Sequence, residues 1–365
     1  MHIPDGYLSP STCAVLYGAS APFWYAALQR VKAILTTRLV PLLSVMAALS
    51  FVIMMFNLPL PGGTTGHAVG VAIATIILGP WASILAISIA LSIQAVFFGD
   101  GGITTLGANC FNMAIVGSLT AYAVYRIIAG RAALTSPRRV MAAALAGYTA
   151  INASALCAAV EFGIQPIFFK DPSGAPLYAP YPLHIAIPAM MIGHLTFAGL
   201  AELVLSAGVV AYFQRTNPSL LKLTAPGNLA PDDAIADPGS QSLWHTLRPL
   251  WIGLAVLLVL TPLGILAAGT AWGEWSARDF SNLQTREKMA IASRHTAPPA
   301  QPPRGLERLS SLWTAPFPQY APSFVHRPAM GYALSGMFGA GAIILVSLIA
   351  GSLAARGKRK GSQEP

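Results

Sequence analysis

Long apolar runs separated by short polar loops dominate the chain. Nine of them predict helices, at approximately 11–29, 38–57, 66–79, 81–98, 108–129, 139–163, 184–213, 247–269 and 330–355. A membrane span needs about 20 mostly apolar residues, and several of these runs supply them. The third and fourth runs are short and meet at Gly79-Pro80, where proline breaks the helix. The pattern predicts an all-α, polytopic membrane bundle of about nine transmembrane helices.

The polar loops predict the orientation of these helices. Cytoplasmic loops are enriched in Lys and Arg. Basic residues occur at 30–38, 126–139, 215–222 and 356–360, whereas the short loops 58–65 and 99–107 have none. The long segment 270–329 has several, but a loop of that length is largely exempt from the rule. We therefore expect the N-terminus outside and the C-terminus in the cytoplasm.

A polar stretch also divides the chain into two parts. Residues 216–246 are rich in Pro, Asp, Gly and Ser, which is typical of a linker, here on the cytoplasmic side. They separate a first membrane domain of about seven helices, 1–215, from a two-helix module, 247–365, with a long outer loop. The Pro-rich part of that loop, 281–328, predicts no regular fold.

Composition excludes several classes of protein. The chain is 55% hydrophobic and only 10% charged, too little charge to cover a soluble protein of this size. The net charge is +9, and the basic residues lie between apolar runs. This distribution fits contact with lipid head groups better than binding to nucleic acid. Three scattered cysteines indicate neither a disulfide framework nor a thiolate metal site. The polar start lacks the basic and apolar regions of a cleaved signal, so we expect Met1 to remain in the mature protein.

The first residues carry the strongest chemical signal. The α-amine of Met1, the backbone nitrogen of His2 and its imidazole Nδ1 can close two fused chelate rings on one metal ion. The turn-forming Pro4-Asp5-Gly6 could fold this end inward. The next histidine, His67, is predicted on the same outer side, after a glycine-rich loop whose Thr64 and Thr65 could cap the third helix. Four nitrogens in a plane suit Ni²⁺ or Cu²⁺.

The same residues also allow a simpler interpretation. Any protein that begins Met-His has this chelating potential, and a free terminus normally frays unused. The residues alone therefore leave the metal site open.

Three stretches resemble a known family. The opening MHIPDGYLSP, the pair Gly66-His67 and residues 98–117 (FGDGGITTLGANCFNMAIVG) resemble the substrate-binding membrane subunit of cobalt and nickel energy-coupling-factor (ECF) transporters, the CbiM/NikM family. The resemblance covers roughly residues 1–215. The last two helices and their long loop, with Trp272-Gly273-Glu274-Trp275, look like a fused accessory module of the CbiN/NikN type.

The resemblance implies a function and a set of metal ligands. The protein would be the substrate-binding component of an ATP-driven importer of a divalent transition-metal ion in the bacterial plasma membrane, with no further cofactor. The same family transports Ni²⁺ and Co²⁺, and planar nitrogen coordination favours Ni²⁺. Met1, His2 and His67 match the family's ligands. A membrane coupling protein and cytoplasmic ATPases would be its partners, since this chain has no GxxxxGK[ST] phosphate loop.

Other polar residues could support the site. We expect a second shell around the metal, drawn from side chains that could orient His2 and His67 or simply cap turns: Gln94, Asp100, Thr104, Thr105 and Asn109. Glu161, His194 and Glu202 lie in or near predicted helices, and we expect them to bond between helices or to contact partner subunits. If they moved protons, the chain would instead be a secondary metal transporter. An intramembrane metalloenzyme is a further alternative, although no HExxH motif occurs.

Overall fold

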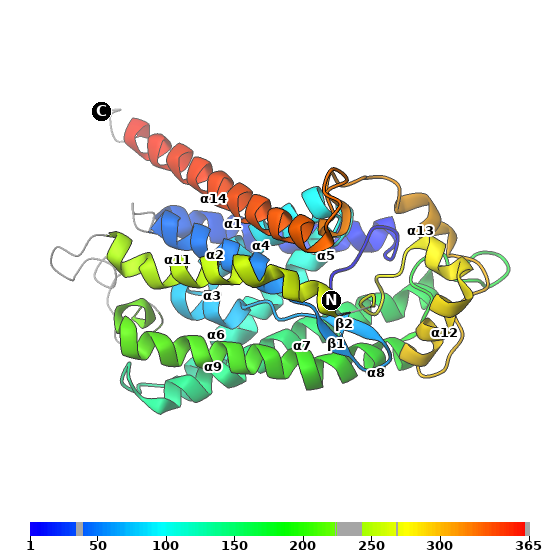
Figure 1. The fold of residues 1–365 in the computed structure, drawn as a ribbon, viewed down its shortest axis with the longest axis horizontal. Coiled ribbons are helices and arrows are strands. Elements are labelled where there is room, and N and C mark those ends of the chain that lie inside the picture. The colour runs from blue at the N-terminus through cyan, green and yellow to red at the C-terminus, as the bar shows by residue number, and fades with distance from the viewer. Residues whose placement is uncertain (34–38, 223, 225–242, 268, 362–365) are drawn as a thin grey trace.

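The computed structural model describes residues 1–33, 39–222, 224, 243–267 and 269–361. Most of them are helical, and the long helices lie side by side along the long axis of the molecule (Figure 1). The α-helices are α1 (Pro10–Ala33), α2 (Leu39–Met54), α3 (Val71–Leu78), α4 (Pro80–Ile93), α5 (Leu106–Asn109), α6 (Gly117–Ala129), α7 (Pro137–Phe168), α8 (Leu183–Gly193), α9 (Gly199–Thr216), α11 (Leu243–Leu260), α12 (Leu283–Ala292), α13 (Arg304–Leu309) and α14 (Pro328–Gly361). Most of the predicted linker, at 223 and 225–242, and residues 34–38 of the first basic loop lie outside the described residues.

Each of the nine predicted apolar runs overlaps a helix. In the described part of the chain, six helical runs are long and apolar enough to cross a membrane: 80–98, 106–129, 137–168, 183–216, 247–266 and 328–353. The apolar α2 is shorter, and α3 has eight residues. The protein is therefore a mainly helical, multi-pass membrane protein, whereas the count of nine spans and the orientation of the termini stay predictions.

The third predicted helix begins later than expected. Residues 58–66 form an antiparallel hairpin, β1 (Leu58–Leu60) and β2 (Thr64–Gly66), instead of a helix start, so the structure has this small exception to an all-α fold. Helix α3 begins at Val71 after Gly70, which has φ 73°. The prediction that Thr64 or Thr65 caps this helix is wrong, because both lie in β2. The apolar pattern of the sequence could not show that residues 67–70 are not helical.

Three of the long helical runs contain a π-helical segment. These are η1 (Gln94–Phe98), η2 (Cys110–Val116) and η3 (His194–Ala198). An extra residue in one turn rotates the side chains that follow, and such bulges are frequent at functional sites. Here the segments carry Gln94, Asn112 and His194, three buried polar side chains.

The C-terminal module packs against the first domain along α2. Both α11 and α14 contact α2, and the Tyr332 hydroxyl donates to the Met55 carbonyl oxygen at 2.7 Å. The segment 281–328, for which composition predicted no fold, contains α12 and α13 and lies at one end of the bundle, beside the N-terminal segment (Figure 1). The remaining short elements are 3₁₀ turns: η4 (Pro218–Leu221), η5 (Thr261–Leu266), η6 (Ala277–Ser281) and η7 (Pro318–Tyr320).

Candidate metal-binding site

The N-terminal segment is buried in the protein rather than frayed. Met1 is 3% exposed and His2 is 1% exposed. Ile3 is held on both sides of its peptide: its N–H donates to Asn109 Oδ1 at 2.8 Å, and its carbonyl accepts from Gly102 N–H at 2.9 Å and from the Thr105 hydroxyl. These bonds hold the segment against residues 102–109 and place the first two residues inside the molecule.

Asp5 fixes the turn that follows. Its carboxylate accepts from the N–H of Thr104 at 2.7 Å, from the N–H of Ile103 at 3.1 Å and from the Thr104 hydroxyl. Gly102 makes this approach possible, because a Cβ there would lie 2.3 Å from Asp5 Oδ1. Of the predicted supporting residues, Thr104, Thr105 and Asn109 thus contact Ile3 and Asp5 and not the two imidazoles.

The two imidazoles meet at the end of this segment. His2 Nδ1 lies 3.2 Å from His67 Nε2. The Nδ1 atom of His67 lies 3.0 Å from the Ala68 carbonyl oxygen, which can only accept, so Nδ1 carries the hydrogen and Nε2 has a free lone pair. His2 Nε2 likewise faces Gln94 Oε1 at 3.3 Å. The lone pair of His2 is therefore on Nδ1, the atom that faces His67.

A carboxylate oxygen of Asp100 also lies beside the His2 imidazole. Asp100 Oδ1 lies 3.2 Å from His2 Nδ1. His2 Nδ1 therefore has two electron-pair donors beside it, His67 Nε2 and Asp100 Oδ1. With these tautomers no hydrogen lies between the two ring nitrogens, and the arrangement is suited to a cation.

Burial keeps both imidazoles neutral. It lowers the pKa of His2 to about 4, with a further lowering by the nearby terminal ammonium. It lowers the pKa of His67 to about 3, and the His2 ring adds to this effect. A neutral imidazole is the form that binds metals, so at neutral pH a metal ion does not compete with protons at these two rings.

The C-terminal module adds two residues that the sequence did not point to. Glu274 Oε1 lies 3.1 Å from the terminal amine of Met1. The Tyr320 hydroxyl donates to Asp100 Oδ2 at 2.6 Å and accepts from Gln94 Nε2 at 3.0 Å. Burial raises the pKa of Tyr320, so its hydroxyl remains a donor. Glu274 lies in a motif that the sequence analysis noted, but no spacing linked it to a residue 273 positions earlier.

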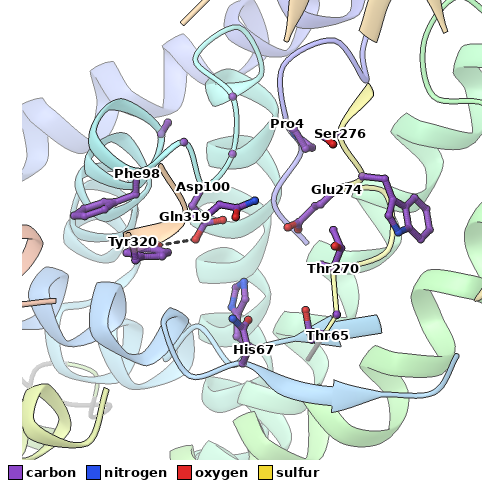
Figure 2. A pocket seen from close by; sticks show the side chains of 18 of the residues that line it. Pro4, Thr65, His67, Phe98, Asp100, Thr270, Glu274, Ser276, Gln319 and Tyr320 are labelled. Carbon is purple, nitrogen blue, oxygen red and sulfur yellow. Dashed lines mark hydrogen bonds between the residues drawn. The ribbon is translucent and has the colours of Figure 1, made fainter. Parts of the chain in front are cut away.

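A cavity of about 540 Å³ lies between the two parts of the chain, and His67, Asp100, Glu274 and Tyr320 line it. Figure 2 shows His67, Asp100 and Glu274 on different walls of this space, with the Tyr320–Asp100 hydrogen bond closing one side. Among the described residues, no group of three or more His, Cys, Asp or Glu side chains is arranged to hold a metal ion by itself. A complete ligand set here would therefore need the terminal amine or backbone nitrogens as well.

The three ionisable residues in the long helices lie elsewhere in the fold. Glu161 accepts from Asn112 Nδ2 at 2.8 Å, a bond between α7 and η2, and His194 Nδ1 bonds to the Met190 carbonyl at 2.8 Å. Glu202 has a different role. Its Oε2 accepts from the N–H groups of Val69 and Gly70, at 2.7 and 2.9 Å, and so holds the backbone immediately after His67.

Comparisons with known proteins agree with this architecture. Residues 2–220 match the family described as the cobalt uptake substrate-specific transmembrane region, CbiM, and residues 248–356 match the PDGLE domain. The chain is 54% identical to a fused nickel transport protein, NikMN, of Rhodobacter capsulatus, over 99% of this chain and 100% of that protein. It is 42% identical to a probable fused nickel transport protein, LarMN, of Lactiplantibacillus plantarum, over 80% of this chain and 82% of that protein.

A solved structure shares the fold of the first part. The crystal structure of a transition metal transporter is 47% identical in sequence and superposes with a TM-score of 0.56, over 59% of this chain and 93% of that one. The chain therefore belongs to the CbiM family of membrane metal-transport proteins and carries a PDGLE domain in its C-terminal part.

Proposed function

We propose that this protein is the substrate-binding component of an ATP-driven ECF-type importer for a divalent transition-metal ion. The ligands are the Met1 amine, the His2 backbone nitrogen, His2 Nδ1 and His67 Nε2. The observation that carries this proposal is the 3.2 Å approach of His2 Nδ1 to His67 Nε2, with both rings buried and neutral and their lone pairs facing one another.

The separation of the ring nitrogens suits neighbouring ligands of one ion. Metal–nitrogen bonds of about 2.0 Å at a right angle place two nitrogens about 2.9 Å apart. The observed 3.2 Å needs only a small adjustment. When His2 Nδ1 binds an ion, the His2 backbone nitrogen and the Met1 amine lie within reach of the same ion. Together the three atoms close a five-membered and a six-membered chelate ring.

The ligand set favours nickel over cobalt. Four nitrogens in a plane, one of them a deprotonated amide, suit Ni²⁺ better than a metal that prefers oxygen ligands or higher coordination. Two relatives are named as a nickel transport protein and a probable nickel transport protein, whereas the matched family is described as a cobalt uptake region. Asp100 and Glu274 would balance the charge of the ion from its surroundings.

In this proposal some supporting residues contact His2 directly, and others hold the backbone that carries it. Gln94 and Asp100 contact His2 directly and fix its ring. Thr104, Thr105 and Asn109 act through the backbone of Ile3 and the carboxylate of Asp5, and so hold the whole N-terminal segment in place.

Energy for transport comes from other subunits in this proposal. The chain has no phosphate-binding loop, so a membrane coupling protein and cytoplasmic ATPases would drive release of the ion to the inside. The N-terminus faces outward and the C-terminus lies in the cytoplasm. Residues 1–215 form the metal-binding domain, 216–246 the cytoplasmic linker and 247–365 the accessory module.

A proton-driven secondary transporter has less support. Its carriers would be Glu161, Glu202 or His194, yet Glu161 is bonded to Asn112 and Glu202 to the backbone of Val69 and Gly70. Uptake that collapses with the proton gradient while the ATPases remain active would favour that alternative. A metalloenzyme would need an open metal position, which a planar set of four nitrogens offers only axially.

The proposal is tested by uptake of radioactive nickel into cells that carry this chain and its coupling partners. We expect His2→Ala and an extra N-terminal Ala each to lower uptake at least about a hundredfold, because the first removes the imidazole Nδ1 and the second converts the Met1 amine into an amide and shifts the chelate out of register with His67. His184→Ala, an exposed histidine in α8, is the matched control and should retain uptake. Unchanged uptake in both N-terminal variants, with normal membrane insertion, would overturn the ligand set. Radioactive cobalt in the same assay ranks the two ions.

A further inference from the structure

Glu274 is the hydrogen-bonding partner of the terminal amine. Its Oε1 is 3.1 Å from the Met1 nitrogen, and the side chains of Met1 and Glu274 are 1% and 20% exposed. The bond joins the first residue of the chain to a residue 273 positions later, in the PDGLE domain. A metal ligand in one part of the protein is thus held by a carboxylate from the other.

Two anchored tryptophans fix the position of this carboxylate. Trp272 packs against Phe162 and Tyr181, with ring centroids 5.8 and 5.9 Å away, and its Nε1–H donates to Ser293 Oγ at 3.1 Å. On the other side, the Trp275 carbonyl accepts from the Tyr7 hydroxyl at 2.7 Å. Trp272 and Trp275 are 6% and 4% exposed. Glu274 is therefore part of a rigid turn and not a mobile surface residue.

Gly273 lets this turn approach the first domain. It has φ 83°, and a Cβ there would lie 2.9 Å from the ring of Phe162. Only glycine adopts this backbone conformation without strain and fits this space. The sequence Trp-Gly-Glu-Trp thus combines two anchors, one close approach and one carboxylate aimed at the amine.

We propose that Glu274 is a positioning residue for metal capture: it holds the Met1 amine at the chelate site before the ion arrives. This inference rests on the proposed function. A free terminus has several rotatable bonds, and ordering it on binding reduces affinity. A bond to Glu274 orders the amine in advance, beside the cavity through which His67 and Asp100 are reached. The accessory module thereby contributes to the affinity of a site whose ligands all lie in the first domain.

The test compares Glu274→Gln with Glu287→Gln in the full chain. Glu287 is exposed in α12, so its substitution removes one negative charge from the same module without touching the site. The first readout is independent of metal: the rate at which an amine-reactive reagent labels Met1 in metal-free protein, measured by mass spectrometry of the N-terminal peptide. The second is the nickel concentration that gives half-maximal uptake, together with the maximal rate.

We expect Glu274→Gln to label Met1 faster and to raise the half-maximal nickel concentration about tenfold, the size expected for one charge-assisted hydrogen bond. The maximal rate should change little, and Glu274→Asp should restore part of the loss. Glu287→Gln should match the wild type in both readouts. Labelling and half-maximal concentration equal to those of the wild type would overturn the proposal, as would faster labelling with no change in nickel dependence.

The outcome separates this inference from the proposed function. If His2→Ala retains nickel uptake, the ligand set fails, whatever Glu274 does. If His2→Ala abolishes uptake and Glu274→Gln behaves as the wild type, the ligand set holds and the positioning role of Glu274 fails.

Discussion

At the scale of single residues, hydrogen-bond partners decide which atoms can bind a metal. The Ala68 carbonyl takes the Nδ1 hydrogen of His67, and Gln94 Oε1 takes the Nε2 hydrogen of His2. Gln94 is itself oriented, since its Nε2 donates to Tyr320 at 3.0 Å. Each imidazole therefore presents a lone pair to the other, and the partners that fix the tautomers come from three different segments of the chain.

The neutral imidazoles predict how many protons nickel displaces. Because the pKa values of His2 and His67 are lowered to about 4 and 3, both rings are already deprotonated at pH 6. Binding at pH 6 should then release about two protons, one from the Met1 ammonium and one from the His2 amide. The two rings should weaken nickel affinity only as the pH falls to near 4.

Calorimetry at pH 6, in buffers that differ in heat of protonation, measures this number. Imidazoles with an ordinary pKa near 6.5 would be largely protonated at that pH, and the release would rise above about three protons. Such a value would contradict the neutral pair, and a release near zero would exclude the amine and amide as ligands.

At the scale of elements, irregular backbone positions the site. His67 lies in the extended segment between β2 and α3, and Gln94 lies in the π-helical η1. The carboxylate of Glu202, on α9, lies at the start of α3 and accepts from the N–H groups of Val69 and Gly70, the two residues before the helix. A negative charge at a helix start is favourable, and here it also fixes the backbone that carries His67.

Glu202→Ala should therefore loosen both α3 and the metal site. It leaves the N–H groups of Val69 and Gly70 buried without an acceptor, which should lower the free energy of unfolding by about 3 kcal/mol. The thermal midpoint in detergent and the nickel affinity should fall together. Ser206→Ala is the control: Ser206 lies one turn further along α9, is buried, and has no hydrogen-bond partner among the described residues. Equal midpoints for the two variants would contradict this role of Glu202.

At the scale of the whole molecule, the two parts of the chain form one site. The helices α11 and α14 pack along α2, and the loop between them reaches the N-terminal segment at one end of the bundle (Figure 1). Two glycines mark this close approach: a Cβ at Gly6 would lie 2.7 Å from the Leu306 backbone, and one at Gly305 would lie 2.3 Å from the Tyr178 ring. The PDGLE domain is thus fitted to the first domain, and the cavity between them is a joint feature.

The packing of α14 on α2 can be tested with two neighbouring glycines. A Cβ at Gly339 would lie 2.1 Å from the Phe51 ring, whereas one at Gly341 meets nothing within 4 Å. Gly339→Leu should cost about 3 kcal/mol of stability or displace α14, and in either case reduce nickel uptake. Gly341→Leu, on the same helix, should leave both close to the wild type. Identical thermal midpoints and uptake rates for the two variants would show that this contact does not hold the module in place.

The sequence alone determined the class of protein and the helical runs, and it predicted the residues of the N-terminal metal site. The length of an apolar run identifies a membrane helix without any knowledge of tertiary contacts. A Met-His terminus likewise carries its chelating atoms within two residues. Local pattern could not place the start of α3, because Glu202, far away in the chain, binds the backbone N–H groups of Val69 and Gly70 and the helix begins only after the left-handed Gly70. It also could not find Glu274 and Tyr320. Their contacts with Met1 and Asp100 exist only because the helices α11 and α14 dock on α2 and bring the loop between them over the site, and no periodicity in a sequence encodes a contact across more than 200 residues.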